Sequence, residues 1–419
     1  MALLTKAPRG TQDILPGQTE KWQYVEQALR ETAQLYGIQE IRVPTFEHTE
    51  LFNRSVGDTT DVVQKEMYTF QDKGDRSITL RPEGTAGAAR ALIEHGLLAG
   101  TLPVKVWYNA SCFRYEKPQA GRLREFHQFG IELIGSPAPI MDVQAIAFAS
   151  DVFRRLGLED IRLELNSIGC PECRANYHRA LRQYLEERKD SLCETCCQRL
   201  EKNPMRVLDC KKEGCQAIIA DAPSVLDCLD EECTAHFEKV QAILKENGIP
   251  FTVDPKIVRG LDYYTRTVFE FVFDGLTVCG GGRYDMLVEE CGGKPTGAVG
   301  FGLGIERLMM ILEKLNGPLA DMPERDVYIG SMGEAGLMRA QALTFALRKS
   351  GVKADCDTVE RSVKAQMKYA NKIGAKYSVI LGDSELESGK VQLKEMETGE
   401  AEEVSVADLV EILKEKCGK

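Results

Sequence analysis

Three arginines gather around one predicted turn of the chain. Arg114 ends a β-rich run, Arg122 and Arg124 begin the next one, and a polar link from Glu116 to Gly121 joins the two runs. The proline and glycine of that link are typical of a loop, so the stretch from Val106 to Gly135 is predicted to form a β-hairpin. Three guanidinium groups beside one turn are suited to forked recognition of phosphate.

The second run of this hairpin carries its polar groups on one face. Side chains two residues apart in a strand share a face, so Gln128, Gly130 and Glu132 point the same way. The other face carries His127, Phe129, Ile131 and Leu133. An amide, a carboxylate and a glycine that admits a ligand to the backbone would form the floor of a binding site. The alternative is a half-exposed strand with ordinary polar residues facing solvent.

A second polar group follows a predicted hairpin made of residues 67–71 and 77–80. A proline ends this hairpin, Thr85 is placed to cap a helix expected from Ala86 to Leu98, and Glu83 stands just before that helix. Two roles are open to Glu83. Its carboxylate could bind a ligand, or it could simply interact with the helix dipole, which is worth about 0.3–1 kcal/mol.

Strand pattern resumes between Lys256 and Phe273, where Arg259 stands just before Gly260. Alternation after that glycine places Tyr263 and Tyr264 on opposite faces of the predicted strand. Arg259 is free to project from the point where the strand begins.

A glycine-rich segment follows this strand. It contains Gly280–Gly282 and then Gly297, Gly300, Gly302 and Gly304. The spacing does not match the GxGxxG of a dinucleotide-binding fold, which is therefore excluded. We expect a strand without side chains, against which a flat ligand ring could lie, and Arg307 in the first turn of the helix that follows. The alternative is a glycine-rich core strand beside a solvated arginine.

Composition indicates a cytoplasmic globular protein. A chain of 419 residues is too long for one ordinary core, so two or three domains are expected. No apolar run approaches the length of a membrane span and no signal-peptide core is present near residue 1, so we expect no membrane partner. The net charge of -11 argues against wholesale wrapping of nucleic acid but permits a local basic face.

The segment from about residue 170 to residue 253 differs from its surroundings, with charged helices, little strand pattern and nine cysteines. We expect an inserted subdomain. Cys170 with Cys173, and Cys193 with Cys196, form two CxxC pairs at a separation compatible with a structural zinc ribbon, and Cys210 and Cys215 are further candidates. The alternative is a set of buried, reduced thiols, which the absence of a secretory signal also favours.

Composition predicts a linker at residues 316–324, and the chain beyond it alternates strand and helix as a small α/β domain. One helix expected at residues 361–374 carries a basic stripe. The stripe consists of Arg361, Lys364, Lys368 and Lys372, continued by Lys376. Such a stripe is usually a solvated helix face, and on an acidic chain it is also the best place for an RNA backbone to dock.

Taken together, these motifs resemble the class II aminoacyl-tRNA synthetases, and specifically the histidyl-tRNA synthetase family. The resemblance spans nearly the whole chain and rests on PRGTQDILP, RPEGTAG, FRYEKPQAGRLREFHQFG, IVRGLDYYTRTVFEF and GFGLGIERL, in the family's order. RGLDYY is the most discriminating motif, because other class II enzymes share only the general arginine and glycine motifs. The cysteine-rich insert departs from the family's commoner pattern.

The resemblance implies an α+β fold, with an antiparallel catalytic sheet flanked by helices in residues 1–322, a helical insertion at about 170–253, and an α/β anticodon-binding domain in residues 323–419. It implies ATP-dependent activation of L-histidine to histidyl-adenylate and transfer to the 3′ end of tRNA(His). It also implies Mg2+ as a cofactor, and a homodimer built partly around Pro44, which ends an expected edge strand.

The resemblance also implies roles for single residues. Arg259 and Arg114 would be catalytic, with Arg114 on the α-phosphate and Arg259 bridging carboxylate and phosphate. Arg307 would meet the far end of the triphosphate, beside Mg2+. The implied ATP contacts also include Arg122, Gly302 and Gly304. The implied histidine contacts are Glu83, Thr85 and Gln128 for the ammonium group, Glu132 with Tyr264 for the imidazole, and Arg114, Arg259 and Tyr263.

A rival function comes from another class of protein. A non-catalytic paralogue of this family binds histidine as a regulatory subunit in histidine biosynthesis. The presence of Arg114, Arg259 and Arg307, and of a complete α/β domain after residue 322, argues against that function. A class II synthetase for another amino acid is disfavoured by RGLDYY and Glu132.

Overall fold

The computed structural model describes residues 5–57, 60, 62–208, 210–257, 259–315 and 325–419. The chain divides into two compact units, Met1–Leu319 and Ala320–Lys419. The expected linker, residues 316–324, and the boundary expected between residues 322 and 323 lie outside the described residues.

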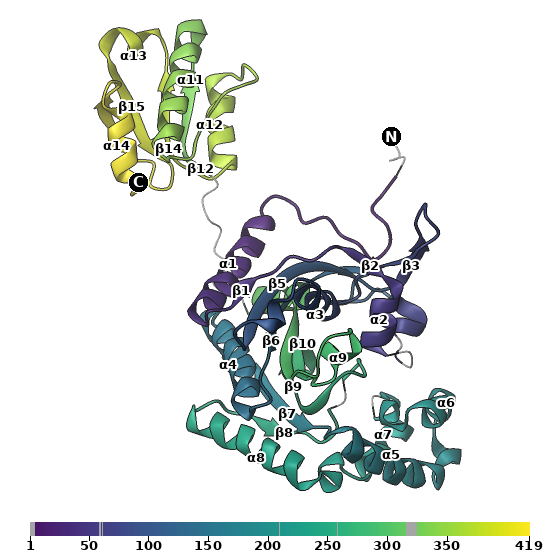
Figure 1. Ribbon diagram of the computed structural model, residues 1–419. Helices are drawn as coiled ribbons and strands as arrows, with labels where there is room; N and C mark the ends of the chain where they lie inside the picture. The colour runs from purple at the N-terminus through teal and green to yellow at the C-terminus, as the bar shows by residue number, and fades with distance from the viewer. Residues whose placement is uncertain (1–4, 58–59, 61, 209, 258, 316–324) are drawn as a thin grey trace. The chain divides into compact units, whose positions relative to one another are not determined.

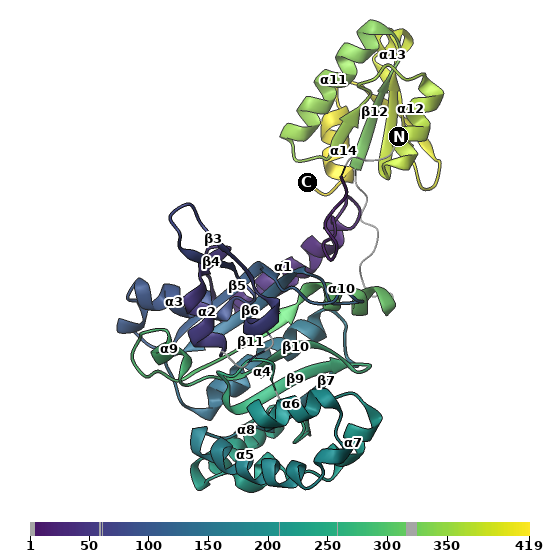
Figure 2. The ribbon, with the colours of Figure 1, turned by 90° about the vertical axis from the view of Figure 1, so that its right-hand side faces the viewer.

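The first unit is built on an eight-stranded sheet with the order β1-β5-β6-β11-β10-β9-β7-β8. Its inner strands are all antiparallel, and only the edge pairs β1·β5 and β7·β8 are parallel. Figure 2 shows the strands from β5 to β7 following one another across the unit. The expected antiparallel catalytic sheet is therefore confirmed. Its strands are β1 (Gln39–Glu40), β5 (Val104–Phe113), β6 (Glu125–Ile134), β7 (Arg162–Ser167), β8 (Thr252–Val253), β9 (Thr265–Phe273), β10 (Leu276–Arg283) and β11 (Ala298–Gly304).

Helices cover one face of this sheet with the main apolar core. Side chains from α1, α4, α8 and α10 pack there against the inward residues of the strands, including Phe129, Ile131 and Phe301. Burying such side chains stabilises the fold by about 1.5–3 kcal/mol each. The helices of the first unit outside the insert are α1 (Thr19–Leu35), α2 (Thr49–Val56), α3 (Thr85–Glu94), α4 (Pro139–Arg155), α9 (Leu287–Glu290) and α10 (Ile305–Lys314).

The other face of the sheet is covered by α3, α9 and helices of the insert, and its apolar cluster includes Tyr263, Tyr264 and Tyr284. A small antiparallel sheet leads into α3. It consists of β2 (Phe46–His48), β4 (Ser77–Leu80) and β3 (Tyr68–Gln71), in that order. The hairpin expected at residues 67–71 and 77–80 is thus present.

The helices of the insert connect β7 to β8; α8 packs beside α4 against the sheet, and the other three lie beyond that edge of the sheet (Figure 1). The helices of the insert are α5 (Pro171–Glu186), α6 (Glu194–Lys202), α7 (Glu213–Ala220) and α8 (Glu231–Glu246), with a short 3-10 turn at Pro204–Val207. This segment is mainly helical between strands that pair with each other, as expected of an insertion.

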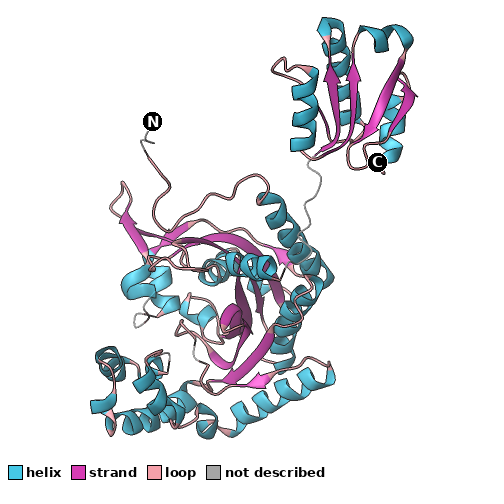
Figure 3. Cartoon of the chain, turned by 180° about the vertical axis from the view of Figure 1, so that it is seen from behind, coloured by secondary structure: helices cyan, strands magenta, loops and turns pink. Residues whose placement is uncertain are grey.

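The second unit is a five-stranded sheet with helices on both faces (Figure 3). Residues of α11 and α14 pack on one face, and Ala370 of α12 packs beside Tyr328 in a separate cluster. Sequence pattern missed α13 and β16. The sheet order is β13 (Ala354–Cys356), β12 (Arg325–Ser331), β14 (Ala375–Leu381), β15 (Lys390–Glu395) and β16 (Ala401–Ser405), and the helices are α11 (Gly333–Lys349), α12 (Val363–Lys372), α13 (Asp383–Ser388) and α14 (Leu409–Lys416).

Among the described residues, no helix is both long enough and apolar enough to cross a membrane.

Candidate active site

The predicted central hairpin is formed by β5 and β6, which pair in one unbroken register from Val104↔Ile134 to Phe113↔Glu125. Phe129, Ile131 and Leu133 enter the main core. Because alternate residues of a strand face opposite ways, Gln128, Gly130 and Glu132 lie on the other face, as predicted. This face forms the floor of the candidate site.

Glycines of neighbouring strands lie side by side in this floor. Gly302 pairs with Gly130 on one side and with Gly280 on the other. A β-carbon on Gly280 would overlap the guanidinium of Arg259, and one on Gly302 would overlap the amide of Gln128. The glycines therefore make room for long polar side chains to cross the floor, which is a more specific role than the bare backbone surface predicted from sequence.

Glu83 interacts with the start of α3. Its carboxylate oxygens accept hydrogen bonds from the backbone N–H groups of Thr85 at 3.1 Å and Ala86 at 2.8 Å. The prediction that Thr85 caps this helix was wrong. Glu83 supplies the acceptor instead, and Thr85 is the first helical residue. The Tyr263 hydroxyl also donates to Glu83, at 3.3 Å.

Gln128 and Tyr108 join this cluster from the central hairpin. The carbonyl oxygen of Gln128 accepts hydrogen bonds from the Gly84 N–H at 3.1 Å and from the Tyr108 hydroxyl at 3.3 Å. The Tyr108 hydroxyl also lies 3.4 Å from Thr85 Oγ1. Sequence reasoning missed Tyr108, although alternation in the first run of the hairpin places it on the same face as Gly130, its strand partner.

Glu132 is buried, with 1 % of its surface exposed. The Tyr284 hydroxyl donates a hydrogen bond to Oε2, whereas Oε1 has no hydrogen-bond partner among the described residues. Burial, together with the nearby carboxylate of Glu83, raises the pKa of Glu132 well above its ordinary value. Tyr284 was also missed, because it follows the glycine run in a stretch without clear strand pattern.

Three tyrosine rings line the site above Glu132. The ring centroids of Tyr263 and Tyr264 are 4.7 Å apart, and those of Tyr264 and Tyr284 are 6.3 Å apart. The prediction that Tyr263 and Tyr264 face opposite ways was wrong, because β9 begins only at Thr265 and both tyrosines precede it, Tyr263 as the last residue of a turn. Strand alternation does not apply to such a turn.

Arg259 lies beside these rings, with its guanidinium carbon 5.6 Å from the centroid of Tyr264. It forms an ion pair with Glu270 of β9, and its Nε has no partner among the residues that the structure describes. Burial alone would lower the pKa of Arg259, but the charge of Glu270 raises it above its ordinary value. Arg259 therefore carries a permanent positive charge in a largely desolvated place.

A second group of arginines surrounds the loop of the central hairpin. Glu116 lies 3.9 Å from Arg114 and 3.4 Å from Arg122. Arg307 donates to the backbone carbonyl of Gly121 at 3.0 Å, and burial together with the charge of Arg122 lowers its pKa. Like charges held this close favour the binding of an anion between them.

The arginines do not all serve this cluster equally. Arg124 packs over the ring of Tyr115, with its guanidinium carbon 3.8 Å from the centroid, and donates to the Glu116 carbonyl at 3.2 Å. It is thus occupied in holding the turn. Arg114 donates to the carbonyl of Pro82 at 2.9 Å, which links the arginine group to the segment carrying Glu83.

The basic stripe lies in the second unit and is shorter than predicted. Arg361 stands before α12 and is paired with the buried Asp357 at 2.7 Å, while Lys376 belongs to β14. Both are excluded from the helix because it begins at Val363 and ends at Lys372. Lys364, Lys368 and Lys372 remain exposed on α12.

The cysteines of the insert do not form the single ribbon that the two CxxC pairs suggested. Cys193 and Cys196 lie with Cys210 and Cys215, whereas Cys170 and Cys173 lie with Cys233 and Asp230. The two pairs are separated because each stands at the start of a different helix, α5 or α6.

An antiparallel sheet of this order, with arginines from a hairpin and from the helix after a glycine-rich strand on one face, defines a class II aminoacyl-tRNA synthetase. Residues 10–308 match the model of the histidyl-tRNA synthetase family, and residues 326–416 match that of the anticodon binding domain. The chain belongs to the histidyl-tRNA synthetase family.

Individual relatives agree with this family. A histidine--tRNA ligase of Acetivibrio thermocellus is 52% identical, with 98% of this chain and 100% of the relative covered. One of Clostridium perfringens (strain SM101) is 55% identical, with 98% and 99% covered. The crystal structure of apo S. aureus histidyl-tRNA synthetase is similar with a TM-score of 0.83 and 42% identity, covering 98% of this chain and 100% of that one.

The fold alone is shared more widely. A Bacillus halodurans structure described as an ATP phosphoribosyltransferase regulatory subunit/histidyl-tRNA synthetase is similar with a TM-score of 0.66 at 21% identity, covering 91% of this chain and 99% of that one. The choice between ligase and regulatory subunit therefore depends on the site and on the full-length relatives, not on the fold.

Proposed function

We propose that this chain activates L-histidine with ATP to form histidyl-adenylate and transfers the histidyl group to the 3′ end of tRNA(His). The observation that carries this proposal is the placement of a buried set of hydrogen-bond acceptors, Glu83, Gln128 and Glu132, next to a group of arginines. In the reaction, the histidine carboxylate attacks the α-phosphate of ATP. Both groups are anionic, so the enzyme must chiefly neutralise charge and align the reactants.

These acceptors would form the histidine-binding pocket. Glu83 and the carbonyl oxygen of Gln128 are acceptors suited to the substrate ammonium group, with Thr85 beside them. Glu132 has one carboxylate oxygen without a partner among the described residues, and that oxygen can accept the N–H of an imidazole. Tyr263 and Tyr264 would enclose the ring. A non-polar side chain of similar size would leave these buried polar groups unpaired, which is the basis for selecting histidine.

The arginines would bind ATP and promote the reaction. Arg259 lies between the pocket and the glycine floor, so we assign it the bridge between carboxylate and α-phosphate, with Arg114 as its partner on the phosphate. Arg307 and Arg122 would hold the outer phosphates. Gly304 of β11 would allow the adenine end of ATP to approach the backbone, whereas the predicted contact at Gly302 is wrong because the amide of Gln128 covers that glycine.

Magnesium would accompany the triphosphate. Glu116 and Glu270 are carboxylates next to the arginines, and carboxylate and phosphate oxygens are the ligands that Mg2+ takes in such sites. These residues therefore fit a magnesium ion held largely by ATP. The ion would neutralise charge on the phosphates.

The second unit would bind the tRNA. Lys364, Lys368 and Lys372 are exposed on one helix, and Arg361, although paired with Asp357, lies next to it. Changing Lys364 and Lys368 to Ala should weaken tRNA binding and reduce the slope of log K against log salt, by about 0.9 per lost duplex phosphate contact. An unchanged slope would place the tRNA contacts elsewhere.

We also propose that the chain works in the cytoplasm as a homodimer.

The alternative function is that of a regulatory subunit, and the arginines assigned to catalysis distinguish a ligase from such a subunit. A subunit that only binds histidine has no need of Arg114, Arg259 and Arg307 grouped on one face, or of a second unit. The full-length relatives at 52% and 55% identity carry the ligase name.

Pyrophosphate exchange into ATP, measured with each amino acid in turn, tests this function. We expect exchange with histidine only, and charging of tRNA(His) by the same preparation. Histidine binding without exchange would establish the regulatory function instead, and exchange with another amino acid would overturn the assignment of the pocket.

A further inference from the structure

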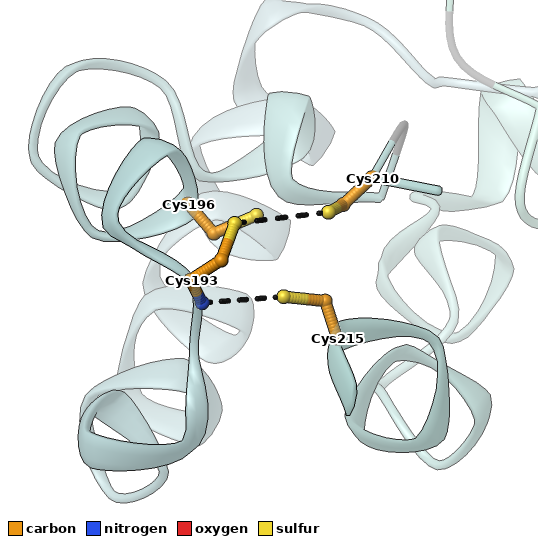
Figure 4. Close-up of side chains that lie close together, drawn as sticks. All are labelled: Cys193, Cys196, Cys210 and Cys215. Carbon is orange, nitrogen blue, oxygen red and sulfur yellow. Dashed lines mark hydrogen bonds between the residues drawn. The ribbon is translucent and has the colours of Figure 1, made fainter. Parts of the chain in front are cut away.

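Four cysteine sulfurs of the insert meet at one point. Cys193, Cys196, Cys210 and Cys215, here called the tetracysteine cluster, have sulfurs that all lie within 4.8 Å of one another. Figure 4 shows Cys193 and Cys196, from one stretch of backbone, facing Cys210 and Cys215 from two others. The sulfurs of Cys193 and Cys210 are 3.9 Å apart.

These distances identify the kind of contact. A disulfide would bring two sulfurs to about 2.0 Å, and all four of these cysteines are free. Sulfurs arranged tetrahedrally around zinc at about 2.3 Å from the metal lie about 3.8 Å apart. The separation between Cys193 and Cys210 is therefore that of two ligands of one ion.

The alternative is that the thiols simply pack in an apolar core, since cysteine is often buried. Cys196, Cys210 and Cys215 are indeed buried within such a cluster. Apolar packing does not require four sulfurs to converge, however. Nor does it explain the backbone N–H of Cys193, which points at the sulfur of Cys215 at 3.3 Å, a contact that stabilises a thiolate.

Sequence spacing and helix position agree with a metal site. Cys193 and Cys196 are separated by two residues, and Cys210 and Cys215 by four, within the usual range for paired zinc ligands. Cys193 is the residue before α6, Cys196 lies in its first turn, and Cys215 lies near the start of α7. Helix N-termini favour ionised thiolates, the form that binds metal.

A second group joins the start of the insert to the start of its last helix, α8. Cys170, Cys173, Cys233 and Asp230, here called the neck cluster, also have ligand atoms within 4.8 Å of one another. Asp230 Oδ2 lies 3.1 Å from the sulfurs of both Cys170 and Cys173, which are themselves 3.5 Å apart. The cluster joins the first residue before α5 to the first turn of α8.

We propose that the tetracysteine cluster and the neck cluster each bind one structural zinc ion. Four protein ligands close the coordination sphere in each case, which is typical of structural and not of catalytic zinc. Each ion would take up the charge left when the thiols lose their protons, so binding should release protons.

The two ions would also fix the segment that follows Arg259. Arg206, between Cys196 and Cys210 in the chain, donates to the carbonyl of Gly260 at 2.8 Å. Arg174, next to Cys173, donates to the carbonyls of Asp262 at 3.1 Å and Tyr264 at 2.8 Å. Both arginines are positioning residues. Zinc loss should loosen this segment and raise the KM for histidine more than that for ATP, an effect that rests on the proposed function.

Metal content of the full-length chain tests the sites directly. We expect inductively coupled plasma mass spectrometry to find about two zinc ions per chain after purification without added metal. Cys193→Ser and Cys170→Ser should each lose about one ion. Cys197→Ser and Cys228→Ser remove neighbouring thiols outside both clusters, so these variants should keep both ions. If Cys193→Ser and Cys197→Ser contain equal amounts of zinc, the tetracysteine site is overturned. If Cys170→Ser and Cys228→Ser contain equal amounts of zinc, the neck site is overturned.

Two measurements on the unaltered chain avoid the risk that a variant does not fold. Titration with an organomercurial should release zinc in proportion to thiols modified. Replacement of zinc by cobalt should give the absorption bands of tetrahedral cobalt thiolate. A chain that contains no metal and binds neither added ion would overturn the proposal.

Exchange activity separates this inference from the proposed function. Chelation that removes both ions and raises the KM for histidine would support the link to the Gly260–Tyr264 segment, and an unchanged KM would overturn that link. Zinc in a chain that shows no exchange with any amino acid would support the metal sites while contradicting the proposed function.

Discussion

Arg259 holds its charge in a largely desolvated place, where the structure shows one ion-pair partner for it among the described residues, Glu270. We predict that Arg259→Ala lowers histidine-dependent exchange about a hundredfold to a thousandfold, because a preorganised donor to a charged transition state usually contributes that much. The protein should remain folded and still bind histidine weakly. Pyrophosphate exchange and equilibrium dialysis measure the two effects.

The substitution also leaves Glu270 without its arginine, which could repel ATP by itself. The double variant Arg259→Ala/Glu270→Ala removes both charges and is the matched control. If the double variant regains exchange within a few-fold of the parent, Arg259 only neutralises Glu270 and the catalytic assignment is rejected.

Glu132 has a raised pKa and one unpartnered oxygen, so the protonation state of its carboxyl group should decide how well histidine binds. We predict that Glu132→Gln raises the KM for histidine far more than that for ATP, because the amide keeps the shape but cannot give up a proton to become a carboxylate when the imidazole binds. Steady-state exchange with each substrate varied separately gives the two values. Equal effects on both substrates would show that Glu132 is structural.

The same substitution makes a prediction about stability. The folded state holds the Glu132 proton above the ordinary pKa of 4.5, so its contribution to stability is present below pH 4.5 and is lost as pH rises toward the folded pKa. Glu132→Gln should therefore raise the Tm of the ligand-free chain at pH 8 relative to the parent, and the difference should shrink near pH 4.5. Calorimetry across this range measures it. A Tm difference that does not change with pH would contradict the titration of Glu132.

At the scale of single strands, neighbouring glycines of β10 should respond differently to substitution. A β-carbon on Gly280 would meet the flexible end of Arg259, whereas one on Gly281 would meet the backbone oxygen of Gly300. We predict that Gly280→Ala folds normally but loses most exchange activity, because Arg259 is displaced. Gly281→Ala should instead lower the free energy of unfolding by about 1–3 kcal/mol, as overpacking usually does.

Urea unfolding and exchange, measured on both variants, separate the two effects. Each variant is the control for the other, since the change is the same and the positions are adjacent. If Gly280→Ala loses stability but keeps its exchange activity, the role given to the glycine floor is contradicted.

The central hairpin was predictable because period-two alternation over β6 is unbroken and its loop contains proline and glycine. The same rule failed at Tyr263 and Tyr264, where a turn delays the strand to Thr265. The partner of Glu132, Tyr284, comes from a segment more than a hundred residues away. Such long-range contacts depend on strand order, which local pattern does not encode.

The cysteines show the same limit. Spacing identified Cys170, Cys173, Cys193 and Cys196 as candidate ligands, but not which of them share a site. Their grouping is set by the helices of the insert, since Cys170 and Cys193 each precede a different helix. Asp230 and Cys233 complete the neck cluster, and only the fold brings them next to Cys170 and Cys173.

At the scale of the whole molecule, the two units should divide the work. Every residue assigned to adenylation precedes residue 323, so we predict that a fragment of residues 1–322 keeps histidine-dependent exchange. Charging of tRNA(His) should collapse, because the basic helix α12 is removed. Exchange and charging assays on the fragment and on the full chain measure both. A fragment that charges tRNA as well as the full chain would contradict this division.

The eight-stranded sheet ends on both sides in a strand of two residues, Gln39–Glu40 and Thr252–Val253. Long bare edges are templates for aggregation, because their unpaired backbone groups recruit further strands. The outermost strands β1 and β8 each offer backbone for only about one further pairing, and Glu40 of β1 adds a charge held by Arg30 and Arg42. These two strands are thus poor templates for strand addition. A second copy of the chain that approached β1 near Pro44 would therefore have to bind mainly through side chains rather than by adding a strand to the sheet.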